Sequence, residues 1–137
     1  METTLVLVKP DGVSRGLVGE VVKRIEARGL QIAGLKLLVA DKRVVEEHYA
    51  EHKGKPFYAG VCGRLVDGPL VAMAVRGENA VRTIRAMMGA TDPAEAAPGT
   101  VRGDLAHAMS ANVTHSSSDQ VAAARELAIW FPEGLCH

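Results

Sequence analysis

The sequence predicts an α+β fold in which four strands form a mainly antiparallel sheet with helices packed against it. Three observations favour this class: short apolar runs typical of buried strands, segments with helical periodicity between them, and Gly/Pro turns that separate the two. The chain has 137 residues, 47% of them hydrophobic, which suffices for one sizeable core. We therefore expect residues 1–137 to form a single domain.

The first half of the chain supplies two strands, a helix and a helical hairpin. A continuous apolar run at 5–8 predicts a buried strand that ends in the turn Lys9-Pro10-Asp11-Gly12. Apolar residues recur at helical spacing between 18 and 25, and Gly29 ends that helix. Residues 30–40 are predicted to form the second strand. Two short helices are expected at 44–52 and 57–66.

The second half supplies a strand at 70–75, a helix at 79–88, a strand ending at His115 and a last helix at 119–131. Between 89 and 111 the chain is rich in Gly, Pro and Thr, and its periodicity is weak. A loop of this length in a compact domain is usually functional or disordered, and its place before His115 favours function. Without the insertions, the order β-α-β-β-α-β is that of a ferredoxin-like sheet, with helices expected on one face.

The composition argues against several classes of protein. Lys+Arg and Asp+Glu both number 16, so there is no global basic field for a nucleic acid or a membrane surface. No apolar run approaches the roughly 20 residues of a membrane span, and the start Met1-Glu2-Thr3 does not resemble a secretory leader. Cys62 and Cys136 fit neither a metal motif nor a disulfide framework. We expect a cytoplasmic protein.

The segment Asn112-Val113-Thr114-His115-Ser116-Ser117-Ser118-Asp119 carries the candidate chemistry. Ser117 to Gln120 fits a capping box, which would place His115 just ahead of a helix N-terminus. The partial positive charge there disfavours an imidazolium and attracts a phosphate. A neutral imidazole beside an anion site can attack a phosphoryl group and carry it covalently. Glu126, on the last helix, could reach the ring and fix its tautomer.

Several blocks of the chain, from about Thr3 to Pro132, resemble the nucleoside diphosphate kinase family in order and spacing. They are Asn112-Val113-Thr114-His115, the opening strand at 7–13, the helix start at 15–20, the hairpin motifs at 48–49 and 55–58, the turn at 68–69, and the loop segments 89–93 and 98–104. The resemblance implies transfer of the γ-phosphate of ATP or another nucleoside triphosphate to a nucleoside diphosphate, with broad base specificity. It also implies Mg²⁺ bound mainly through the nucleotide phosphates, a ping-pong mechanism through phosphohistidine at His115, and a homo-oligomer. For the oligomer, both a tetramer and a hexamer stay open, and we favour the hexamer.

The same resemblance implies roles for individual residues. The catalytic set would be His115, Glu126, Ser117, Lys9 and Tyr49. The base would contact Phe57, Val61 and Met109. The sugar hydroxyls would bond Lys9 and Asn112, and Lys9 would also reach the phosphates. The other side chains around the phosphates would be Tyr49, Arg85, Thr91 and Arg102. No G-x-x-x-x-G-K-[ST] loop occurs, so side chains such as these must hold the phosphates.

The turn after the histidine departs from the family's usual His-Gly-Ser-Asp-Ser. Ser116 replaces the glycine, and the acid follows one place later as Asp119, after Ser118. If the backbone needs a positive φ at residue 116, the serine costs about 1 kcal/mol of strain. Ala111 stands where many members of the family have arginine. We expect activity to be retained, because the residues implied in chemistry and phosphate binding are present.

Two other functions stay open. The altered turn is compatible with a nucleotide-binding scaffold that has lost catalysis. A ferredoxin-like RNA-binding module would need exposed aromatic residues on its strands and a basic face, whereas these strands carry Leu, Val and Ala. His48 and His52 lie one helical turn apart and could chelate a metal, but they do not form H-E-x-x-H, and we expect no metal site there.

Overall fold

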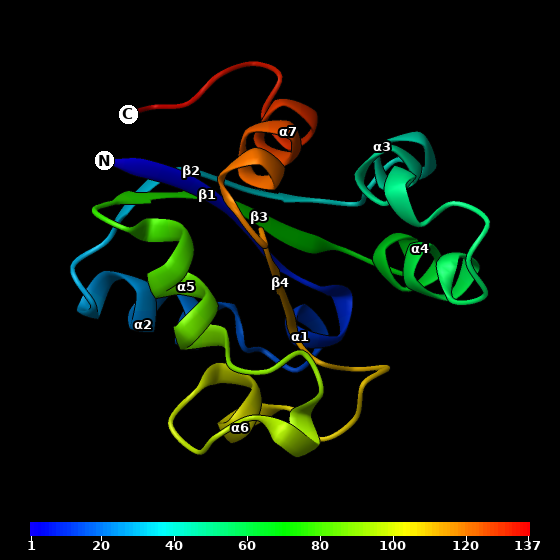
Figure 1. Cartoon of the computed structure of the whole chain (residues 1–137), viewed down its shortest axis with the longest axis horizontal. Coiled ribbons are helices and arrows are strands. Elements are labelled where there is room, and N and C mark those ends of the chain that lie inside the picture. The colour runs from blue at the N-terminus through cyan, green and yellow to red at the C-terminus, as the bar shows by residue number, and fades with distance from the viewer.

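The computed structural model describes residues 1–137 and contains one four-stranded sheet (Figure 1). Its strands are β1 (Glu2–Val8), β2 (Gln31–Leu38), β3 (Leu70–Gly77) and β4 (Thr114–Ser116). They lie in the order β2-β3-β1-β4, and every neighbouring pair is antiparallel. The predicted ferredoxin-like sheet is confirmed. The order places the short edge strand β4, which carries His115, beside the end of β1.

Helices connect the strands and cover both faces of the sheet. They are α1 (Pro10–Ser14), α2 (Val18–Ala27), α3 (Lys42–His48), η1 (Ala50–His52), α4 (Tyr58–Val66), α5 (Ala80–Met88), η2 (Pro93–Glu95), α6 (Val101–Leu105) and α7 (Gln120–Trp130). The predicted helices at 18–25, 57–66, 79–88 and 119–131 agree with α2, α4, α5 and α7 to within a few residues. None of the helices is long and apolar enough to cross a bilayer.

Each face of the sheet has its own apolar cluster. On one face, α2 and α5 pack against residues of β1 such as Val6. On the opposite face, α7 packs Trp130 in a cluster with Leu5 and Leu7. Figure 1 shows α7 on the side of the sheet away from α2 and α5. The expectation of helices on one face is wrong, because β1 is apolar at every position from Leu5 to Val8 and needs cover on both faces.

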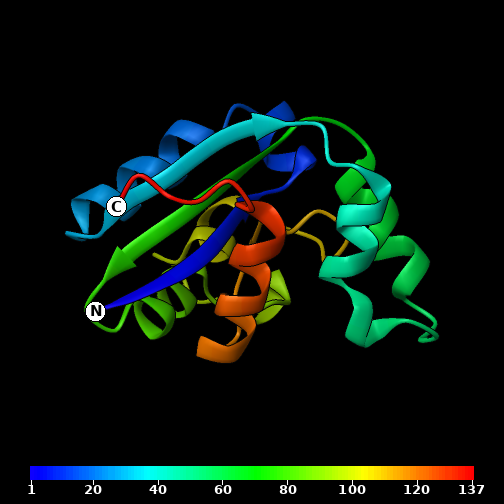
Figure 2. The same cartoon turned by 90° about the horizontal axis from the view of Figure 1, so that it is seen from above.

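A helical hairpin stands at one end of the sheet. Helices α3 and α4, joined through η1, lie side by side there, as Figures 1 and 2 show. The hairpin turns at Gly54, whose φ of +90° suits glycine. Its only fully buried apolar residues are Val45 of α3 and Leu65 of α4. The hairpin is therefore anchored to the core at its base, and much of the remainder faces solvent.

Two segments are more ordered than the sequence predicted. Residues 10–14 form α1 instead of a simple turn, with Pro10 at the first helical position, where its fixed φ is favourable. The predicted loop at 89–111 contains η2 and α6, capped by the side chains of Asp92 and Thr100. A Cβ at Gly103 would lie 1.9 Å from the Ala97 carbonyl oxygen, so the tight packing of this segment requires glycine there.

Candidate active site

His115 is the middle residue of β4, where it pairs with Leu7 of β1. Side chains alternate across a strand, and Thr114 and Ser116 are accordingly buried on one side. The His115 ring projects from the other side toward α7, and the side chain is 20% exposed to solvent. The edge strand therefore delivers the imidazole to a position that is mostly enclosed but open to solvent.

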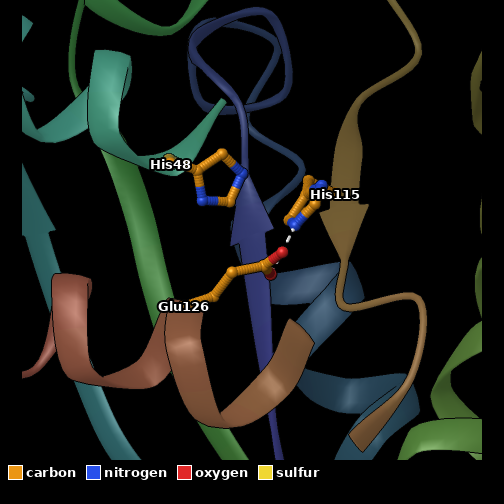
Figure 3. A group of neighbouring side chains, drawn as sticks. All are labelled: His48, His115 and Glu126. Atoms are coloured by element: carbon orange, nitrogen blue, oxygen red, sulfur yellow. Dashed lines mark hydrogen bonds and ion pairs between the residues drawn. The ribbon is translucent and has the colours of Figure 1, made fainter. Parts of the chain in front are cut away.

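A carboxylate and a hydroxyl hold this ring. The His115 Nε2 lies 2.9 Å from Glu126 Oε1, and Ser117 Oγ donates to the same oxygen at 2.8 Å (Figure 3). Because an ionised carboxylate only accepts hydrogen bonds, Nε2 carries the proton of the neutral ring. The lone pair is therefore on Nδ1, which Figure 3 shows turned away from Glu126.

The pair is a neutral imidazole and an ionised carboxylate at neutral pH. Burial is the largest influence on the pKa of His115 and lowers it; Glu126 opposes this only in part, and Lys9 and Arg102 add to the lowering. Burial pushes the pKa of Glu126 upward, but the hydrogen bonds and charges around it outweigh burial, and the net shift is downward. The ring thus keeps a free lone pair over the physiological pH range.

The last helix begins later than the capping box predicted. Its N-cap is Asp119, whose side chain accepts a hydrogen bond of 2.7 Å from the Ala122 amide, and Gln120 is the first helical residue. Ser117 is not a cap, because its hydroxyl is bonded to Glu126. The helix N-terminus therefore lies farther from His115 than the capping box predicted, and burial is the largest cause of the lowered pKa of His115.

The residue substituted after the histidine lies in regular strand backbone. Ser116 pairs with Val6 in β4, and only Asn79 and Val113 have positive φ among the non-glycine residues. The strain expected at Ser116 is therefore not present. Its hydroxyl is buried without a hydrogen-bond partner, and its carbonyl accepts a bond of 3.2 Å from Arg85.

Strain is instead found at Val113, two residues before His115. Val113 has a φ of +71°, and the Thr114 amide bonds the Asn112 carbonyl at 2.8 Å across it, which defines a γ-turn. Such a conformation in a β-branched residue costs on the order of 1–3 kcal/mol. The Val113 amide is held by Asp11 Oδ2 at 3.0 Å, and its carbonyl by the Lys9 amide at 2.8 Å. Nothing in the sequence pattern indicated this turn.

Arg102 ties the long segment to β4. Its guanidinium donates to the carbonyl oxygens of Asn112 at 3.3 Å, Gly89 at 2.9 Å and Thr114 at 2.7 Å. Arg102 is only 3% exposed, and burial, with Arg85, lowers its pKa to about 10. It remains cationic at neutral pH and is held in one place by the backbone around His115.

Lys9 and Asn112 form a second polar unit in the same cleft. The ammonium donates to Asn112 Oδ1 at 2.8 Å, and the amide of that asparagine donates to the Thr91 carbonyl at 3.0 Å. Burial, followed by the charge of Arg102, lowers the pKa of Lys9 to about 8. The closeness of two cations that are not paired with carboxylates indicates a site for an anion.

These groups line one cavity of about 240 Å³. It contains all of the sequence-predicted residues except Ser117, which lies behind Glu126: Lys9, Tyr49, Phe57, Val61, Arg85, Thr91, Arg102, Met109, Asn112, His115 and Glu126. Burial raises the pKa of the Tyr49 phenol to about 12, so it remains protonated at neutral pH and can donate a hydrogen bond into the cavity. Sequence reasoning gave no site role to Arg64, whose helical position gave no signal. It considered His48 as part of the hairpin motif and as a possible metal ligand, but not as a residue of the cavity.

Three potential metal ligands meet in this cavity, but their hydrogen bonds oppose metal binding. Ligand atoms of His48, His115 and Glu126 lie within 4.8 Å of one another. The His48 Nδ1 accepts a bond of 2.9 Å from the Trp130 indole, so the proton of that ring is on Nε2. With both Nε2 atoms protonated, His48 and His115 offer a cation no lone pair at this point. His52 is not part of this group.

The fold and the cleft define a class of protein: an α+β domain that holds an uncharged imidazole beside a cationic cavity suited to phosphate. The sequence model of the family described as nucleoside diphosphate kinase matches residues 2–135. A nucleoside diphosphate kinase from Methanosarcina barkeri is 53% identical over 133 residues, which cover 97% of this chain and 89% of that protein. The chain therefore belongs to the nucleoside diphosphate kinase family and is an enzyme of that type.

Solved structures agree with this assignment. A family protein from Babesia bovis superposes with a TM-score of 0.95 at 45% identity, covering 98% of this chain and 92% of that one. A halophilic nucleoside diphosphate kinase from Halobacterium salinarum, solved in complex with CDP, has a TM-score of 0.94 at 45% identity and covers 98% and 90%. The fold predicted from the resemblance is thus confirmed over nearly the whole chain.

Proposed function

We propose that the enzyme transfers the γ-phosphate of a nucleoside triphosphate to a nucleoside diphosphate by a ping-pong mechanism through a phosphohistidine on His115. The observation that carries this proposal is the bond between His115 Nε2 and Glu126 Oε1, which leaves Nδ1 with the lone pair beside a cationic cavity. A positioned imidazole of lowered pKa is an uncharged nucleophile at neutral pH.

In the first half-reaction, the Nδ1 lone pair forms a bond to the γ-phosphorus while the bond to the β–γ bridging oxygen breaks, and the nucleoside diphosphate leaves. The ring then carries a positive charge, which Glu126 stabilises at 2.9 Å. In the second half-reaction, a terminal β-phosphate oxygen of another diphosphate forms a bond to the phosphorus while the Nδ1–P bond breaks. Its electron pair returns to Nδ1 and restores the neutral ring. Ser117 positions Glu126 through its bond of 2.8 Å throughout.

The phosphates would be held by the cationic and hydroxyl groups of the cavity: Lys9, Tyr49, Arg85, Thr91 and Arg102. Phosphoryl transfer depends mainly on positioning and charge stabilisation, which such groups supply. Of the carboxylates that line the cavity, Glu126 is occupied by His115 and Ser117, and Glu51 is exposed. We therefore propose that Mg²⁺ is bound by oxygens of the nucleotide phosphates, where it would neutralise charge, and not by protein side chains.

The base would stack on Phe57 and touch Val61 and Met109, with the sugar hydroxyls near Lys9 and Asn112. Phe57 and Met109 are 48% and 54% exposed, as expected for side chains that await an apolar partner. These contacts involve the flat face of a base and not its hydrogen-bonding edge. Because every base has such a face, these contacts do not distinguish one base from another. We infer broad base specificity. CDP in the Halobacterium salinarum structure is one nucleotide bound by a relative of this fold.

We also propose that the chain assembles with itself. Leu35, Leu37 and Val39 lie at the edge strand β2 or just beyond it, and they are 56%, 67% and 65% exposed. An open strand edge with such side chains favours pairing with a second copy. The resulting dimer would be the building unit of a hexamer or a tetramer. The proposed location is the cytoplasm, where the free thiols of Cys62 and Cys136 would stay reduced.

The two rival functions have less support. The inactive-scaffold hypothesis depended on strain at Ser116, whose backbone is that of an ordinary strand. The RNA-binding hypothesis needs an open sheet face, whereas both faces of this sheet are covered by helices.

Incubation with γ-labelled ATP tests the proposal. We expect wild-type protein to acquire an acid-labile, base-stable label and to release it as labelled triphosphate when a nucleoside diphosphate is added. His115→Ala should take no label, while His107→Ala, a change of an exposed histidine in the long segment, should behave like wild type. Folded wild-type protein without label, or a labelled His115→Ala variant, would refute the phosphohistidine mechanism.

A further inference from the structure

His48 is a buried imidazole to which the proposed chemistry gives no part. It is the last residue of α3 and is only 2% exposed. Its ring centroid lies 4.5 Å from that of His115, and the two planes meet at 77°. It is therefore the aromatic wall against which the reacting ring rests.

Trp130 fixes the tautomer of His48. The Trp130 indole can only donate, and it does so to His48 Nδ1 at 2.9 Å. The proton of the neutral His48 ring is therefore on Nε2. Figure 3 shows His48 turned with one ring nitrogen toward His115 and the other away from it. Since Nδ1 is bound to Trp130, the nitrogen near His115 is Nε2 with its hydrogen.

An N–H group that faces an aromatic ring acts on the electron density of that ring. Its positive end is attracted by the electron-rich neutral imidazole and repelled by the imidazolium. We propose that Trp130 and His48 form a positioning pair that holds the His115 ring in place and in its uncharged form. This inference deepens the proposed function and rests on it, because it concerns how the nucleophile is kept ready.

Charged groups on three other elements also face His115 and influence its protonation. Glu126 of α7 favours the protonated ring, whereas Lys9 at the end of β1 and Arg102 of α6 disfavour it. The guanidinium of Arg125 lies 3.7 Å from the carboxylate of Glu126 and weakens its effect on the pKa of His115. Burial lowers the pKa of His48 itself to about 3, so its tautomer and its N–H dipole stay constant while His115 titrates.

Four variants separate a positioning role from a merely structural one. His48→Leu removes the N–H group but keeps an apolar wall. Trp130→Phe removes the bond that fixes the tautomer. His48→Gln is the conservative variant, because an amide can accept from Trp130 and donate toward His115. Phe131→Leu is the control, since it also reduces an aromatic side chain of the α7 cluster, but its ring packs against Gly34 and Lys36 of β2.

The first measurement is an NMR titration of the His115 ring in the nucleotide-free protein. We expect its pKa to rise by about half a unit in His48→Leu and Trp130→Phe. In His48→Gln and Phe131→Leu it should stay near the wild-type value. If His48→Leu fails to fold, Trp130→Phe compared with Phe131→Leu decides alone. Equal His115 titrations in wild type and Trp130→Phe would overturn the inference.

The second measurement is the pH profile of the first half-reaction, followed with labelled ATP in a single turnover. The acidic limb should move to higher pH by the same shift in Trp130→Phe, and no such movement would likewise overturn the inference. A wild-type protein that never becomes labelled would instead refute the proposed function. The NMR titration needs no turnover, so the two failures are distinguishable.

Discussion

The two ends of the cleft differ in how firmly their side chains are held. At the chemical end, His115, Ser117 and Glu126 are joined by hydrogen bonds of 2.8 and 2.9 Å, and Glu126 is 4% exposed. At the base end, Phe57 and Met109 are about half exposed. The nearest ring to Phe57 is that of His52 at 5.2 Å. The structure therefore fixes the side chains proposed to react and holds those proposed to contact the base only loosely.

This difference matches the two demands of the proposed reaction. In-line transfer to a nitrogen lone pair tolerates little misplacement, and a buried network of satisfied hydrogen bonds provides the required rigidity. Binding of any base, by contrast, needs a contact that can adapt to different bases, and an exposed ring on a hairpin can do so. We expect mutations at the chemical end to change kcat and those at the base end to change KM.

The largest effect is expected for Glu126→Gln, which preserves shape but removes the charge that stabilises the protonated or phosphorylated ring. We predict that the rate constant for His115 phosphorylation falls by about 10²-fold or more. Rapid-quench measurement with labelled ATP would show it, with Glu78→Gln as an exposed control. A loss seen only in KM would show that Glu126 acts in binding and not in chemistry.

Arg102→Lys should affect both stability and activity. A lysine ammonium cannot reach all three carbonyls that the guanidinium now satisfies, so the segment around His115 loosens. We predict that the free energy of unfolding falls by about 2 kcal/mol and that kcat/KM falls by about tenfold. Urea denaturation and steady-state assays measure these, and Arg28→Lys on the exposed end of α2 is the control. Unchanged stability would contradict the structural part of this role.

Phe57→Ala tests the loosely held end. Loss of one stacking contact is worth about 1–3 kcal/mol, so KM should rise by about tenfold for purine and pyrimidine nucleotides alike, with kcat nearly unchanged. The control is Tyr58→Ala, which truncates the next aromatic residue outside the cavity lining. A KM that rises for one base only would show base-specific recognition at Phe57.

The smallest effect concerns pH. His115, whose pKa is lowered, must be neutral to react, so the acidic limb of kcat/KM should lie below pH 6.5, the usual imidazole value. Lys9, with a pKa of about 8, must be charged to bind phosphate, so kcat/KM should decline above about pH 8. Lys9→Arg, which stays cationic, should remove the alkaline decline at a lower overall rate. A decline that persists in this variant would assign the limb to another group.

The features that follow from local pattern and composition could be predicted from the sequence. Strand β1, helix α5 and the place of Glu126 on α7 follow from apolar periodicity. Most of the residues with predicted site roles, though not Arg64 or His48, followed from the family resemblance. Features set by tertiary contacts could not be predicted. The γ-turn at Val113 depends on Asp11, about 100 positions earlier, and the tautomer of His48 depends on Trp130, 82 positions later. The misplaced cap has the same cause, since the hydroxyl of Ser117 bonds Glu126 and not the helix amides.

The central claim is that Glu126 holds one nitrogen of His115 and leaves the other to react. Phosphorus NMR of the protein after incubation with ATP and Mg²⁺ distinguishes the two phosphohistidine isomers and tests this claim directly. The account predicts a single resonance from phosphate on Nδ1, which is lost in His115→Ala. Phosphate on Nε2, or on any residue other than His115, would contradict it.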